Sequence, residues 1–208
     1  MYSYLHVQLA PLYKVYSEVV KPLIAEIEAR FEEFPAPIHN EIRAYNDHVA
    51  RCYFNIDKPE IVDEQVNKAK GHIERIVLDC YKYLNVRLYD ETVVKFTRRT
   101  KRIDLTAIGN GDFYIEYRKH RQFIIKNLKK AKLLEFAPDK DESLKCYKEV
   151  HSRYTELELL IDSNDTNINW AKAKFRIGKM RNLILWLLAA VASGVIIPEL
   201  WRWIQKLF

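Results

Sequence analysis

The sequence predicts an all-helical protein, namely a cytosolic helical bundle followed by a single C-terminal transmembrane helix. Three observations support this fold class. Only five of the 208 residues are glycine, which argues against a fold rich in tight hairpins or phosphate-binding loops. Apolar residues recur at intervals of three and four over long stretches, the spacing of one helix face. Seventeen uncharged, mostly apolar residues run from Asn182 to Pro198, close to the length of a membrane-spanning helix.

The helices are expected in a definite order along the chain. The first extends from about Ser3 to Phe34, and Pro11 and Pro22 bend or split it. The turn from Ile108 to Asp112 contains two glycines and interrupts the helical pattern. The other helices are expected at Ile38 to Phe54, from Phe113 to Phe136, from Asp141 to Ile161, and from about Asn167 onward. Between the first two of these lies a helix from an N-cap at Asp57 past Cys80, which either continues or restarts near Asp90 and extends through Thr92 to Asp104.

Charge and length suggest four segments. Five cations lie between Lys172 and Arg181 and only two follow Pro198, so the positive-inside rule places the N-terminal part in the cytoplasm of a single-pass protein of the cytoplasmic (inner) membrane. The apolar run would form a helix about 25 Å long, slightly short of a hydrocarbon core of about 30 Å. The alternative is a core helix of a soluble domain. The expected segments are a sensor domain at 1–165, a basic linker helix at 166–181, the membrane span at 182–198 and an interfacial tail at 199–208.

Positive charge is concentrated in one region. Residues 95–132 contain twelve Lys and Arg against three Asp and Glu, whereas residues 1–94 contain eleven against fifteen. The first half of the basic region is Arg98, Arg99, Lys101 and Arg102, together with Lys95. In the second half, a helix wheel places six polar residues within an arc of about 120°. They are Arg118, Lys119, Gln122, Lys126, Lys129 and Lys130.

The opposite side of that helix is apolar and is expected to be buried. It carries Phe113, Tyr117, Ile124 and Ala131, and His120 lies in the same stripe, so we interpret this histidine as a packed core residue. The basic face has three interpretations: a solvated surface, attraction to anionic lipid, or a pocket for a phosphate-bearing ligand. We favour the third over the second, because two basic segments joined by a short turn can form the walls of one site and arginine gives forked hydrogen bonds to phosphate.

Motifs for catalysis are not recognised. The sequence has no glycine-rich phosphate loop, no HExxH or GxSxG motif and no Cys/His spacing typical of zinc sites. We therefore expect no enzymatic activity, no metal and no cofactor. Cys52, Cys80 and Cys146 are far apart and are interpreted as reduced core thiols.

Small residues occupy the middle of the apolar run. Ala189, Ala190, Ser193 and Gly194 pair at intervals of four, the spacing that lets helices pack closely in lipid. Homo-oligomerisation and a narrow apolar pore lined by these residues are one interpretation. The other is that small residues are simply frequent in spanning helices.

In its layout, the chain resembles the small membrane effectors of bacterial anti-phage systems, most of all the channel-forming effector of the Hailong system. The shared features are a helical domain with a concentrated basic region, a basic linker helix and one short C-terminal span. The resemblance implies a tetramer, ion flux, and control by a nucleotide or a single-stranded DNA oligomer made by a partner nucleotidyltransferase. The expected function is therefore a ligand-gated membrane effector that contacts lipid. The alternative is a tail-anchored adaptor that holds a partner protein at the membrane without ion flux.

Overall fold

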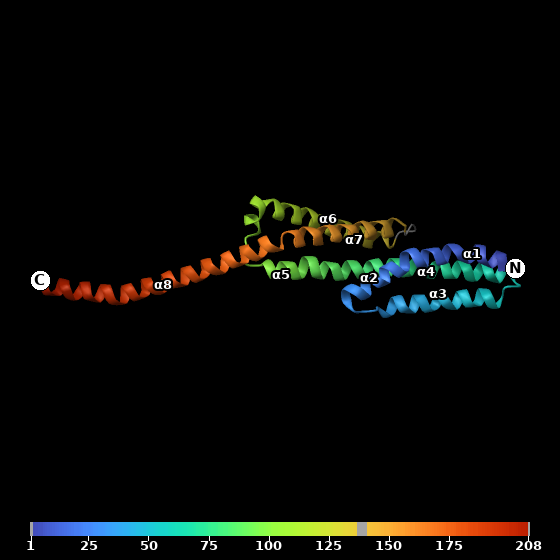
Figure 1. Cartoon of the computed structure of the whole chain (residues 1–208), viewed down its shortest axis with the longest axis horizontal. Coiled ribbons are helices and arrows are strands. Elements are labelled where there is room, and N and C mark those ends of the chain that lie inside the picture. The colour runs from blue at the N-terminus through green and yellow to red at the C-terminus, as the bar shows by residue number, and fades with distance from the viewer. Residues whose placement is uncertain (1, 137–140, 208) are drawn as a thin grey trace. The chain divides into compact units, whose positions relative to one another are not determined.

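The computed structural model is all-helical, with no strand in the part of the chain that it describes. That part comprises residues 2–136 and 141–207, without the side chains of Tyr2, Ala192, Val195, Ile196, Glu199, Lys206 and Leu207. Figure 1 shows the order of the helices along the chain. The α-helices are α1 (Tyr2–Val15), α2 (Lys21–Phe31), α3 (Ala36–Phe54), α4 (Pro59–Tyr89), α5 (Phe96–Thr100), α6 (Asp112–Leu134), α7 (Asp141–Ser163) and α8 (Asp165–Leu207).

The described chain forms two compact units. The first consists of residues 1–94 and 120–157, and the second consists of residues 95–119 and 158–208. The predicted division into four segments is not tested by these units and stays a prediction.

In the first unit, α4 is the element on which α1, α2 and α3 pack. One face of α4 is apolar at helical spacing, and Ile73, Ile76, Cys80 and Leu84 on that face are all buried. The predicted N-terminal helix is present as α1 and α2, which are joined by a π-helical turn at Tyr16–Val20. The expected cap at Asp57 is wrong, because Lys58 is the N-cap of α4.

Helices α6 and α7 complete the first unit against α4. Buried polar groups connect them: Asn85 Nδ2 donates to the Tyr147 carbonyl oxygen at 3.0 Å, and Ser143 Oγ donates to the Ala131 carbonyl oxygen at 2.9 Å. The expected packing of His120 is confirmed, since its side chain is only 12% exposed and Nδ1 lies 3.9 Å from Glu156. All three cysteines are buried, unpaired thiols, as expected.

The second unit contains the predicted turn. Two short 3₁₀ segments, η3 (Leu105–Ala107) and η4 (Gly109–Gly111), separate α5 from α6. Asp104 Oδ1 accepts the backbone N–H of Thr106 at 3.0 Å, and Gly111 has a φ of 97°, which favours glycine. Helix α8 packs on η3, and the rings of Phe96 and Tyr117 lie 4.9 Å apart. The first contact joins α8 to the turn, and the second joins α5 to α6.

Helix α8 is continuous for 43 residues, although Pro198 lies inside it. From Leu183 to Leu188 its apolar side chains are all exposed, as are Trp201 and Trp203. In the residues for which the structure gives a description, no helix meets the length and apolarity needed to cross a membrane. The predicted span from Asn182 to Pro198 includes Ala192, Val195 and Ile196, whose side chains lie outside the described residues, and it stays a prediction.

Candidate anion-binding site

A strongly basic pocket lies in the second unit. Its volume is about 500 Å³, and the side chains that line it come from α5, from the residues directly after α5, and from α8. Seven of these side chains are cationic and two are apolar. They are Arg98, Arg99, Lys101, Arg102, Lys172, Arg176 and Lys179, with Ile103 and Phe175.

Helix geometry explains why α8 contributes three cations to one wall. Lys172, Arg176 and Lys179 follow one another at intervals of four and three, so they share a face of the helix. Ile168, one turn before Lys172, and Ala171, directly before it, are buried and fix which side of α8 packs inward. The pocket therefore depends on the packing of α8 as well as on its charges.

Arg99 connects the two walls of the pocket. Its guanidinium donates hydrogen bonds to Asp165 and, at 3.1 Å, to Asn169 Oδ1, both in the first turns of α8. Asn169 Nδ2 in turn donates to Asp165 Oδ2 at 2.7 Å. The hydrogen bond from Arg99 lowers the pKa of Asp165 below its ordinary value, so the carboxylate stays ionised and the connection persists at neutral pH.

The other six cations carry uncompensated charge. None of them has an ion pair among the residues that the structure describes, and no described acidic side chain lines the pocket. Like charges held this close repel one another, and a bound anion relieves the repulsion. Three of these six cations, Arg98, Arg102 and Arg176, are arginines, whose planar guanidinium forms two parallel hydrogen bonds to phosphate. Phe175, which is exposed, offers a ring on which a base can stack.

The second half of the basic region does not line this pocket. Arg118 lies over the ring of Tyr114, 5.7 Å from its centroid, and Lys119 pairs with Glu116 at 2.6 Å. The other members belong to the first unit: Gln122, Lys126, Lys129, and Lys130, which pairs with Glu142 at 2.8 Å. The wheel is confirmed as a description of α6, because these six residues are exposed while Phe113, Tyr117, Ile124 and Ala131 are buried. The single site formed by both halves stays a prediction.

Sequence reasoning missed three cations of the pocket. The sequence indicates Lys172, Arg176 and Lys179 only as part of the basic linker helix that flanks the predicted span. Their spacing on one helix face was the available signal, but it gave no indication that α5 lies opposite.

The predicted pore residues all lie on the exposed part of α8. Ser193 Oγ donates to the Ala190 carbonyl oxygen at 2.9 Å, and a Cβ added at Gly194 would meet no atom within 4 Å. Ala189 is exposed as well. Packing of this face in an oligomer stays a prediction. Among the described residues, no cluster of three or more His, Cys, Asp or Glu side chains is placed to hold a metal ion.

Comparison of the chain with models of protein families, with curated proteins and with solved structures gives no match.

Proposed function

We propose that this protein binds a nucleotide or a short single-stranded oligonucleotide through its phosphates in the basic pocket. The observation that supports this function is the set of six cations without an ion pair that face one another across about 500 Å³. A phosphate chain supplies several negative charges along one line, which a single carboxylate ligand does not. The neighbouring Phe175 adds a stacking surface for a base.

Ligand binding acts on α8, because the same helix provides Lys172, Arg176 and Lys179 and continues into the apolar stretch from Asn182. That stretch is apolar on all sides of the helix, and its exposed side chains require cover by lipid or by other chains. We therefore place it in a membrane as part of a homo-oligomer, and the resemblance to the anti-phage effectors favours a tetramer. The protein would act as a ligand-gated ion channel or pore, and the resemblance to anti-phage effectors supplies the biological setting.

Charge reversal of the α8 wall tests the ligand site. The double variant Lys172→Glu, Arg176→Glu should abolish binding of a labelled single-stranded DNA oligomer, measured by fluorescence anisotropy. Lys174→Glu is the matched control, because Lys174 lies on the same helix but stacks over Trp170, 4.9 Å from its ring centroid, and does not line the pocket. Binding that survives the double variant would refute the proposed site.

A second charge reversal tests the rest of the basic region. Arg118, Lys119, Lys126 and Lys130 are replaced together by glutamate in otherwise unchanged protein. If both halves hold the ligand, this quadruple variant weakens binding as strongly as the α8 variant does. If the basic pocket alone holds the ligand, the quadruple variant weakens binding only slightly, through the change in the net charge of the protein.

Ion flux separates the effector from the adaptor. Cells that express the full chain should lose membrane potential, reported by a potential-sensitive dye, and deletion of residues 182–208 should restore it. The pocket variant Lys172→Glu, Arg176→Glu should alter the ligand's effect on flux, whereas Lys174→Glu should not. Dye-tight cells with protein present at the membrane would favour the adaptor function over the channel.

A further inference from the structure

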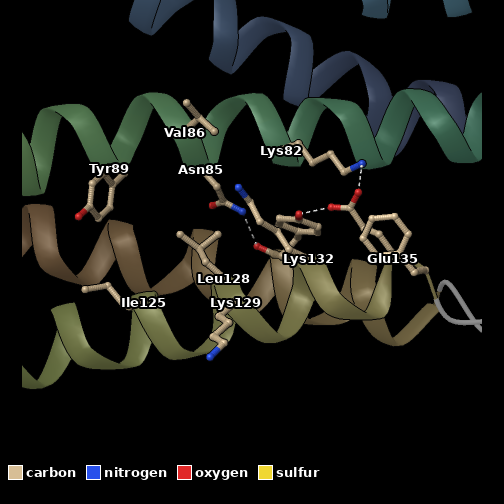
Figure 2. A pocket seen from close by; sticks show the side chains of 11 residues that line it. Lys82, Asn85, Val86, Tyr89, Ile125, Leu128, Lys129, Lys132 and Glu135 are labelled. Carbon is tan, nitrogen blue, oxygen red and sulfur yellow. Dashed lines mark hydrogen bonds and ion pairs between the residues drawn. The ribbon is translucent and has the colours of Figure 1, made fainter.

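A second pocket, in the first unit, has the character of a site for a different ligand. It has a volume of about 720 Å³, within the range of small-molecule sites, and lies between α4 and α6 with Tyr147 of α7 beside them. In Figure 2, Asn85 of α4 and Leu128 and Lys132 of α6 point toward the space between these helices, whereas Lys129 points away from α4. Its walls are mostly apolar: Val86, Ile125, Leu128 and Phe136 contribute, and Phe136 is 91% exposed.

Asn85 is the unusual group in this pocket. It lines the pocket from α4, and its side chain is completely buried, with 0% exposed. Its Nδ2 is used, since it donates to the Tyr147 carbonyl oxygen at 3.0 Å. Its Oδ1 is buried and accepts no hydrogen bond from any described residue. A buried acceptor without a donor costs free energy, so this oxygen is a place where a ligand N–H or O–H would be stabilised.

Charge at the pocket indicates the second feature of the ligand. Lys82 is neutralised by Glu135, whose carboxylate lies 2.8 Å from its Nζ and also accepts a hydrogen bond from the Tyr147 hydroxyl. Lys129 and Lys132, one turn apart on α6, line the same pocket and have no ion pair among the described residues. Lys132 also helps to lower the pKa of Glu135, but three lysines against one glutamate leave the pocket lining with a net positive charge beside an apolar surface. This combination is complementary to an amphipathic anion.

The geometry points to a binding site for an amphipathic anion of the N-acyl amino acid type, which has an apolar chain, an amide N–H and a carboxylate. The chain would lie along Val86, Ile125 and Leu128, and the amide N–H would donate to Asn85 Oδ1. The carboxylate would pair with Lys132, and the charge of Lys129 on the same helix would add a longer-range attraction. This site is separate from the basic pocket and does not rest on the function proposed for it. All the residues that form it belong to one unit.

Two probes of equal chain length isolate the amide. N-decanoylglycine and tridecanoate are both anionic chains, but only the first carries an N–H. Binding is measured by equilibrium dialysis of the radiolabelled probe, below its micelle-forming concentration, against the full chain in lipid nanodiscs, and empty nanodiscs give the background. We expect N-decanoylglycine to bind about three- to tenfold more tightly, the value of one net hydrogen bond.

Substitution of Asn85 is the decisive test. In Asn85→Leu the preference should reverse, because an amide placed in an apolar pocket without a partner is costly. Tyr147 keeps its helical hydrogen bond, and an unchanged melting temperature confirms that the variant is folded. Equal affinity of the two probes for the unaltered protein, or a preference that persists in Asn85→Leu, would overturn the proposal.

A filling variant gives a readout that does not depend on Asn85. Ile125→Trp should occupy the pocket and lower the affinity for N-decanoylglycine at least about tenfold, while Val7→Trp, at an exposed position on α1 outside the pocket, should leave it unchanged. Lys129→Glu should weaken binding at low salt, and Lys145→Glu, on the exposed surface of α7, should not. If Ile125→Trp binds the probe like the unaltered chain, the occupant lies elsewhere and the assignment fails.

Discussion

Removal of two cations from the basic pocket should change the salt dependence of ligand binding by a calculable amount. The substitutions are Lys172→Gln and Arg176→Gln, which remove charge from the α8 wall while keeping long polar side chains there. For single-stranded nucleic acid, the logarithm of the binding constant falls with the logarithm of salt concentration with a slope of about −0.7 for each neutralised phosphate.

The expected slope follows from the number of pocket cations that have no ion pair. Arg99 is engaged with Asp165, so six cations remain to neutralise phosphate, and the limiting slope is about −4. Between about 50 and 200 mM salt, the affinity of the unaltered protein should therefore fall about 300-fold. With two cations removed the limiting slope is about −3, and the fall should be about 50-fold over the same range.

Fluorescence anisotropy of a labelled oligo(dT) at several salt concentrations measures both slopes. Lys174→Gln is the control, because this residue lies outside the pocket, and its slope should match that of the unaltered protein. A slope near zero in the unaltered protein would contradict phosphate binding. A slope that stays the same in the double variant would show that the phosphates bind elsewhere.

Three further outcomes concern the first unit. Ile76→Ala, at a side chain that is 0% exposed, should lower the free energy of unfolding by about 2–5 kcal/mol in urea titrations, and a loss under 1 kcal/mol would contradict tight packing there. Partial burial acts to raise the pKa of Glu135, but hydrogen bonds from Lys82 and Tyr147 outweigh it, so the pKa in the folded protein is lowered. Ionised Glu135 therefore stabilises the fold at pH values above the pKa of this group in the unfolded chain, and the stabilisation is lost as the pH falls through the lowered pKa of the folded protein. The urea midpoints of the unaltered protein and of Glu135→Gln should therefore converge as the pH is lowered from about 6 to about 3. Burial raises the pKa of Cys80 to about 12, so its thiol should react with Ellman's reagent at pH 8 only after unfolding, and rapid reaction of folded protein would count against this burial.

The helices of this protein could be predicted because apolar spacing and glycine scarcity are properties of short sequence windows. The buried stripe of α6, including His120, follows directly from a helical wheel. The π-helical turn at Tyr16–Val20 could not be predicted, because it depends on how α1 and α2 both pack on α4. Pro11 lies inside α1 and does not end this helix.

The candidate sites were predictable only in part. Arg98 and its neighbours on α5 stand out by charge, but their partners on α8 are about 70 residues away, and a single sequence gives no signal for that contact. The same cations on α8 also fitted the basic flank of a span. Asn85 has no distinctive sequence context. Its role as a candidate ligand contact is visible only in the structure, where three helices meet and its side-chain oxygen Oδ1 has no hydrogen-bond donor.

The connection between Arg99 and Asp165 links positions 66 residues apart, and this separation bears on biosynthesis. At usual rates of translation, α5 leaves the ribosome several seconds before Lys172 to Lys179 are added. During that interval its cations have no opposite wall. A nascent or prematurely terminated polypeptide that ends before Lys179 therefore lacks the complete pocket.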